Sequence, residues 1–376
     1  DYFSLPFSER IGKLFAFHNE HRIFTSRLIF ETLYALLGKF AFRLCIWIGD
    51  TILLGYMFLL GRLFSKQIGI VYFIPFLWLF LDLSNYENTL WAMTSVSNQL
   101  VLPLALISLI FFDKRSDLRY FFISLFFAIL CTYTTGAGIF IWPCLAMLAL
   151  KDWFISNGRW LHERLSGKSL LALFNSKVIV FAITAFLSTI FYLRGFIDQS
   201  IKIQASLNFQ PPERNTLINM LDYACSFCGA IVPIHAIALP LGCIVVICII
   251  CVLINIRKIN DHPMLGLLFF ALCSIISGTI FRSRFGASQA LQLRYGIISF
   301  SLIASTFFIF VKLKLISSEY FWKIAVRTMI FGCMLINLST LVLGWELLEQ
   351  RTQQLEIGVG IGPACKAIPS RPASPD

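Results

Sequence analysis

The stretch AIALPLGCIVVICIICVLINI, residues 236–256, decides the fold class of this chain. It contains no charged residue and matches the roughly 20 apolar residues that an α-helix needs to cross a bilayer. Similar runs, each bounded by polar or charged residues, predict about ten membrane spans. They lie at 44–61, 67–83, 96–112, 119–134, 137–150, 178–193, 236–256, 263–281, 295–311 and 324–344. We therefore expect an all-α, polytopic transmembrane helical protein.

The composition supports a membrane class. The chain has 376 residues, of which 58% are hydrophobic and only 14% are charged, whereas soluble domains carry about 25% charged residues. The net charge of +11 does not indicate nucleic-acid binding. The basic residues cluster between the apolar runs, where they set topology and meet anionic lipid headgroups. We expect membrane lipid as a partner and no nucleic acid.

Basic short loops predict which connections face the cytoplasm. The connections that hold at least two Lys or Arg, and that we place in the cytoplasm, are 62–66, 113–117, 151–177, 257–262 and 312–323. Alternation then puts the other connections outside: 84–95, 135–136, 194–235, 282–294 and both ends of the chain.

We treat residues 1–356 as a single polytopic membrane domain. Residues 1–43 precede the first run and carry apolar side chains at helical spacing, which predicts an extracytoplasmic loop with interfacial helices. Residues 357–376 are rich in Gly, Pro and Ala and predict a disordered tail. Because the chain starts at Asp1, we expect one or more spans to precede it.

A dense group of ionisable residues, HNEHR at 18–22, lies in the opening loop. A carboxylate such as Glu20 can take a proton from an acceptor hydroxyl, and Arg22 can pair with it or bind a phosphate. His18 and His21 would share a face if the segment is helical. They could join Glu20 at a metal, although this spacing is weak evidence for one. The alternative is a solvated polar turn between two interfacial helices.

The segment NYENTLW, residues 85–91, offers groups that suit a sugar. The side chains of Glu87 and Asn88 can bond hydroxyls, and Tyr86 or Trp91 can stack on the C–H face of a sugar ring. The alternative is an interfacial aromatic belt with a capped helix start.

Three arginines, Arg282, Arg284 and Arg294, share one short outer loop and oppose the usual positive-inside bias. Their forked guanidinium donors fit phosphate oxygens, so a lipid-linked sugar phosphate is the expected ligand. The alternatives are headgroup binding or a structural ion pair. Two further features favour structural roles: TTGAG at 134–138 predicts a tight turn between helices, and Asp50 within the first run predicts a pair with a neighbouring helix.

These three outer groups, in this order, resemble the GT-C class of integral-membrane glycosyltransferases. Members of that class carry an acidic residue in the first large periplasmic or lumenal loop and use polyprenyl-phosphate-linked sugars as donors. The resemblance covers the hydropathy profile over most of the chain and looks most like bacterial enzymes that modify O-antigen, lipopolysaccharide or other glycans of the cell envelope. Many members have a paired acidic signature and a periplasmic soluble domain. Here Glu20 has no acidic neighbour, and that domain is absent.

The resemblance implies an inverting sugar transfer from a polyprenyl-phosphate donor to a glycan or lipid acceptor, in the bacterial inner membrane. Glu20 would be the general base. The leaving phosphate would be held by Arg282, Arg284 and Arg294. The sugar and acceptor would be bound by Tyr86, Glu87, Asn88, Trp91, His21 and Arg22. No nucleotide cofactor is implied, and a divalent metal is possible but unsupported. The alternatives are a glycan polymerase or ligase, and a non-enzymatic transporter or flippase of a lipid-linked glycan, which would place polar groups at mid-membrane depth.

Overall fold

The computed structural model describes residues 5–18, 21–39, 41–81, 86–157, 176–196, 198–199, 217–232 and 234–313, with short pieces between 324 and 345. Throughout these ranges the regular structure is helical apart from one short hairpin, which confirms the all-α class. The expected tail at 357–376 and parts of the run at 324–344 lie outside the described residues.

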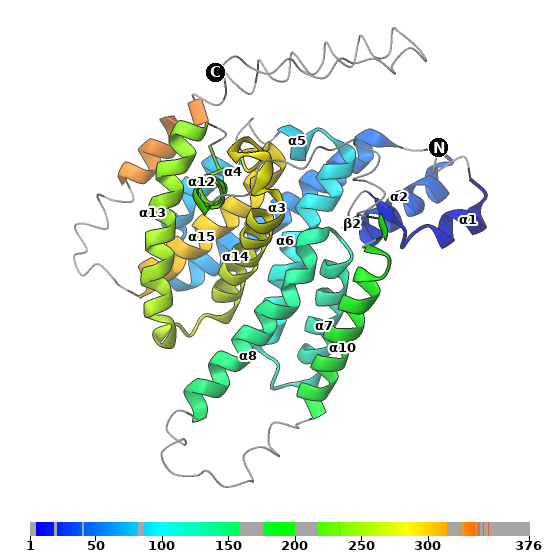
Figure 1. The fold of residues 1–376 in the computed structure, drawn as a ribbon, viewed down its shortest axis with the longest axis horizontal. Helices are drawn as coiled ribbons and strands as arrows, with labels where there is room; N and C mark the ends of the chain where they lie inside the picture. Colours follow the sequence, from blue (N-terminus) through cyan, green and yellow to red (C-terminus); the bar gives the residue numbers. More distant parts are fainter. Residues whose placement is uncertain are drawn as a thin grey trace.

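The elements follow one another along the chain as α-helices (α), 3-10 helices (η) and strands (β) (Figure 1). The first part forms α1 (Phe7–Gly12), β1 (Phe17–His18), β2 (His21–Arg22), α2 (Phe24–Leu37), α3 (Phe42–Gln67), η2 (Ile70–Phe73), α4 (Ile74–Phe80) and α5 (Tyr86–Thr89). The middle forms α6 (Ala92–Asp113), α7 (Leu118–Thr132), η4 (Gly136–Phe140), α8 (Ile141–Asn157) and α10 (Ser176–Leu193). The last part forms α12 (Leu217–Cys228), α13 (His235–Ile254), η5 (Ile256–Lys258), α14 (His262–Arg282), η6 (Ser283–Phe285), η7 (Ala287–Gln289), η8 (Leu293–Tyr295) and α15 (Gly296–Lys312).

In the described chain, five helices are long and apolar enough to cross a membrane, by length and composition. They are α3, α6, α13, α14 and the continuous stretch Gly136–Phe154. Shorter apolar helices accompany them: Ile70–Phe80, α7, Lys177–Leu193, α12 and α15. The chain is thus an integral-membrane protein, with five supported spans where the sequence predicted about ten.

In two places the structure differs from the predicted spans and loops. The run at 67–83 is divided because Gly69 adopts a φ of +105°, a conformation that suits glycine, and Pro75 then starts a new helix, α4. The run therefore forms η2 and α4 instead of one helix of span length. The apolar helix α12 lies inside the region 194–235, which the sequence predicted as one long outer loop.

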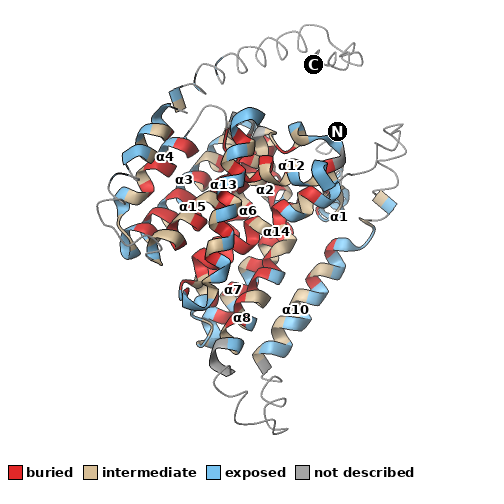
Figure 2. Cartoon of the chain, turned by 60° about the vertical axis from the view of Figure 1, so that its left-hand side comes forward, coloured by how far each residue is buried: buried red, intermediate tan, exposed pale blue. Residues whose placement is uncertain are grey.

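The core forms around α6, which packs against α3, α7 and α14. In α6, 72% of the membrane-length window is buried, compared with 28% in the more hydrophobic α13 (Figure 2). An apolar helix with so little burial inside the protein is typical of a surface that faces lipid. α12 and α13 touch backbone to backbone, since a Cβ on Gly242 would lie 1.7 Å from the carbonyl oxygen of Cys225. Such small-residue contacts are common between membrane helices.

The N-terminal segment forms α1 and α2 on either side of the hairpin β1–β2, close to one end of α6 (Figure 1). α2 packs on α6, and Phe30 joins Cys45 and Val96 in a small core. Phe7 and Leu36 stay exposed. The helices expected in residues 1–43 are therefore present, and their apolar exposed side chains fit an interfacial position.

The bundle has two chemically different ends (Figure 1). The hairpin end holds β1–β2, α5 and η6 to η8. The ionic end holds the last residues of α3, α6 and α15 and the first residues of α14. There His262 contacts Asp113, and Lys312 donates to Gln67 and Asp261. The described parts of the predicted cytoplasmic loops thus gather at the ionic end, and those of the predicted outer loops gather at the hairpin end.

Candidate functional site

The hairpin β1–β2 carries the segment predicted to be catalytic. Its register pairs His18 with His21 across antiparallel strands, so the segment is not helical and the two histidines do not share a helical face. Two-residue strands have no periodicity that a sequence could reveal. Glu20 belongs to the connection between these strands and lies outside the described residues. Its role as a general base stays a prediction.

Arg22 fastens the hairpin to the end of α10. Its guanidinium donates to the backbone carbonyls of Phe15, Tyr192 and Arg194, with 2.9 Å from Nε to the oxygen of Tyr192. It also stacks 4.1 Å from the centroid of the Phe17 ring. Three of its five N–H donors therefore bind the chain itself. Arg22 holds the hairpin in place, a role that the sequence did not predict.

His21 rests against the glycine-rich break between α7 and α8. A Cβ on Gly136 would lie only 2.5 Å from Nδ1 of His21, so the ring fits because residue 136 has no side chain. Beside this contact, Thr25 donates to the hydroxyl of Thr134 at 2.7 Å and its backbone N–H donates to the carbonyl of Tyr133. The break is thus a turn between helices, as expected, and it is also the surface on which the hairpin packs.

An open pocket of about 670 Å³ lies between the hairpin and the end of α10. Its volume falls within the range of small-molecule sites. Within the described part of the chain, neither the guanidinium of Arg194 nor the carboxylate of Asp198 has an ion-pair partner. The wall combines aromatic rings with these polar groups. It is formed by Phe15, Phe17, Arg22, Tyr133, Phe191, Arg194, Gly195, Asp198 and Gln199.

His18 lies next to this pocket wall, in β1. Burial lowers the pKa of His18 below its ordinary value, and the positive charge of Arg27 adds to the effect. His18 is therefore neutral at pH 7, because an unperturbed histidine already titrates near pH 6.5.

The second predicted group is on α5 and at the start of α6. Asn88 is buried, its carbonyl accepts from the Gln99 side chain, and its Oδ1 accepts from Asn98 at 3.3 Å. A sugar bound by Asn88 would compete with these bonds. Trp91 is 44% exposed, so its ring is open to a ligand. The side chains of Tyr86 and Glu87 lie outside the described residues.

The third predicted group is gathered around one tyrosine. Arg282 donates to the hydroxyl of Tyr295, and Arg294 donates to Oε1 of Gln292. Both guanidinium groups lie near the Tyr295 ring, at 5.6 and 5.4 Å from its centroid. The side chain of Arg284, in η6, lies outside the described residues. Because α5 packs against η8, the fold brings the second and third groups together.

Sequence reasoning missed Arg194, Asp198 and the aromatic wall of the pocket. One signal was available, since Arg194 ends an apolar run on the predicted outer side, where a basic residue opposes the positive-inside bias just as Arg282 does. The aromatic residues gave no signal, because Phe occurs 38 times in the chain.

Comparison with known proteins identifies no relative. No family model matches the chain, and neither a curated protein nor a solved structure matches it. Among the described residues, no three His, Cys, Asp or Glu side chains are arranged to hold a metal ion.

Proposed function

We propose that this chain is an integral-membrane glycosyltransferase that moves a sugar from a polyprenyl-phosphate donor to a glycan or lipid acceptor at the hairpin end. The observation that carries the proposal is the open pocket beside the hairpin. It joins aromatic walls to the guanidinium of Arg194, which has no ion-pair partner among the described residues, next to the segment that contains Glu20. A lipid-linked phosphate needs both surfaces, because its chain and sugar pack on apolar rings while its phosphate accepts from a forked cation.

In the proposed step, the oxygen of the acceptor hydroxyl bonds to the anomeric carbon while the bond from that carbon to the phosphate oxygen breaks. The configuration at the carbon inverts. Glu20 takes the hydroxyl proton as the general base. The phosphate leaves with the bonding electron pair, and arginine side chains stabilise its growing charge. The candidates for this task are Arg194, Arg282, Arg284 and Arg294.

The contacts of the hairpin support a catalytic segment that is held rigidly. Arg22 ties it to α10, and His21 is seated on Gly136. A general base works only within hydrogen-bond reach of the proton that it accepts, so a fixed hairpin would position Glu20. Trp91 offers the exposed ring on which a sugar could stack, and Tyr86, Glu87 and Asn88 remain its proposed neighbours.

The test is sugar transfer from a polyprenyl-phosphate donor in liposomes. Glu20→Gln keeps the size of the side chain but removes the base, so turnover should fall roughly 10²–10⁴-fold while donor binding persists. Glu9→Gln is the matched control, since Glu9 is an exposed carboxylate in the same segment. Full activity of Glu20→Gln would remove Glu20 from the mechanism. The absence of transfer by the wild type would count against the enzyme.

Transport of a lipid-linked glycan is a second candidate, because α3 and α6 bring polar groups together inside the bundle. The Asp50 carboxylate contacts Gln99, and oxygen atoms of Asp50, Ser95 and Gln99 are buried. Polar groups within membrane-spanning helices often mark a substrate path. Under this alternative, liposomes should translocate a fluorescent lipid-linked sugar, and Asp50→Asn should abolish that movement. No translocation by the wild type would exclude it.

A further inference from the structure

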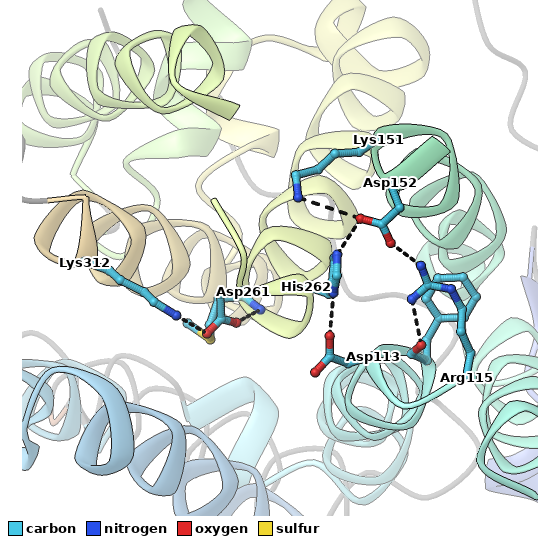
Figure 3. A network of polar contacts seen from close by, with 9 residues as sticks. Asp113, Arg115, Lys151, Asp152, Asp261, His262 and Lys312 are labelled. Carbon is cyan, nitrogen blue, oxygen red and sulfur yellow. Dashed lines mark hydrogen bonds and ion pairs between the residues drawn. The ribbon is translucent and has the colours of Figure 1, made fainter. Parts of the chain in front are cut away.

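His262, the first residue of α14, lies between two carboxylates at the ionic end (Figure 3). Its Nδ1 is 2.5 Å from Oδ1 of Asp113 in α6, and its Nε2 is 2.8 Å from Oδ1 of Asp152 in α8. A neutral imidazole has one N–H donor and one lone-pair nitrogen, so it can donate to only one of them. The imidazolium form donates to both and carries the charge that both carboxylates attract.

Other cations pair with Asp152, whereas Asp113 pairs with His262 and feels Lys151 only at longer range. Arg115 donates to Asp152, and Nζ of Lys151 is 4.0 Å from Oδ1 of Asp152. Lys177 of α10 donates to the backbone carbonyls of Arg115 and Ser116, which follow α6. Among the described residues, His262 is the ion-pair partner of Asp113.

The remaining acid near His262 is already paired. Asp261 precedes His262, accepts from the backbone N–H of Met264 and receives Nζ of Lys312 from α15 at 3.1 Å. Figure 3 shows this pair beside the histidine and separate from it. Loss of the His262 charge would therefore leave Asp113 without its ion-pair partner and with only the more distant charge of Lys151, while Asp152 and Asp261 would keep their paired cations.

We propose that protonated His262 is a pH-sensitive clamp that joins the ends of α6, α8 and α14 and opens when it loses its proton. In an unfolded chain, histidine gives up its proton near pH 6.5, whereas the clamp retains the proton in the folded state. The folded state thus binds more protons, so the clamp contributes fully below that pH and its contribution is lost as the pH rises.

The charge of His262 can be measured directly. Purified protein labelled with ¹⁵N-histidine contains five histidines, and the His262→Gln variant assigns the signal of interest by its disappearance. We expect both His262 nitrogens to be protonated at pH 7.5. A neutral tautomer at that pH would overturn the clamp.

Hydrogen exchange tests whether the clamp opens. Exchange of the peptides around 113–118 and 258–264 would be measured at pH 6 and pH 9 and corrected for the intrinsic rates. Wild-type exchange should rise about tenfold at the higher pH, as expected for loss of a hydrogen bond to a charged group. His262→Gln should exchange fast at both. His235→Gln is the matched control, because His235 at the hairpin end contacts one carboxylate, Asp222, among the residues that the structure describes. An equal response of His262→Gln and wild type would refute the proposal.

A variant that retains the histidine covers the case in which His262→Gln does not fold. Asp113→Asn removes one of the two carboxylates and keeps the ring bonded to Asp152. The opening should then occur at a lower pH than in the wild type. An unchanged opening pH would contradict the clamp.

Discussion

At the ionic end, the charges of Asp113, Asp152 and Asp261 are neutralised within the chain by His262, Arg115 and Lys312. At the hairpin end, Arg22 donates to backbone carbonyls, and Arg194 faces an open pocket without a carboxylate partner in the described chain. The first arrangement closes the bundle. The second leaves a cation available to an external anion.

The comparison separates two uses of charge in one membrane protein. Paired charges at helix ends join helices that are distant in sequence, and their net contribution is modest when solvent reaches them. An unpaired guanidinium beside aromatic rings contributes little to folding and is available to a ligand. The pocket is therefore the stronger candidate for function, although the ionic end holds the larger network of ion pairs in the described chain.

Removal of the Arg22 hydrogen bonds should have the largest effect on stability at the hairpin end. Arg22→Gln loses charged donors to three carbonyls, at a cost of about 2 to 4 kcal/mol. Hydrogen exchange of the amides at 15–22 should therefore rise by more than tenfold, with no change at the ionic end. Arg119→Gln is the control, because the Arg119 side chain is 87% exposed and its one ion pair in the described chain is with Asp117. If these amides exchange in Arg22→Gln at the same rate as in the wild type, the hairpin is held by other contacts.

A smaller effect is expected where His21 meets Gly136. In Gly136→Ala the new Cβ would lie 2.5 Å from Nδ1 of His21, so the ring must move, at a cost of about 1 to 3 kcal/mol. Thermal unfolding should show a lower Tm, whereas Gly12→Ala should not, because no atom lies within 4 Å of a Cβ there. Adding His21→Ala should restore part of the loss. Strictly additive effects would contradict the predicted contact.

The smallest effect concerns pH, where the two ends should respond in opposite directions. The lowered pKa of His18 means that the folded state disfavours its charged form. Its contribution to stability is present above about pH 6.5 and is lost as the pH falls below that value, whereas the His262 clamp is lost as the pH rises. In the wild type, amide exchange at the hairpin end should rise as the pH falls below about 6.5. His18→Gln should remove this rise at the hairpin end and leave exchange at the ionic end unchanged. A rise in exchange at low pH that persists in this variant would exclude His18 as its source.

The sequence predicted the helices because long apolar runs require them, and it predicted which loops share an end because basic residues alternate between them. It did not predict the break at Gly69 and Pro75, since hydropathy is continuous across both. The hairpin was missed because its strands are too short to show a period. The clamp joins His262 to Asp113, 149 residues away, and no local pattern carries such a pairing. The approach of α5 to η8 likewise depends on the packed bundle.

Binding of a polyprenyl phosphate to the purified protein tests the difference between the two ends most directly. Wild type, Arg194→Ala and Arg119→Ala would be compared in nanodiscs of neutral lipid, with an uncharged polyprenol as the reference ligand. Arg194 and Arg119 are both exposed arginines, one at each end of the bundle.

We predict that Arg194→Ala weakens binding of the phosphate about tenfold or more, as expected for the loss of a hydrogen bond between charged groups. Arg119→Ala should leave the affinity unchanged, and the polyprenol should not distinguish the three proteins. Equal affinity of the phosphate for wild type and Arg194→Ala would contradict the assignment of the hairpin-end pocket as the phosphate site.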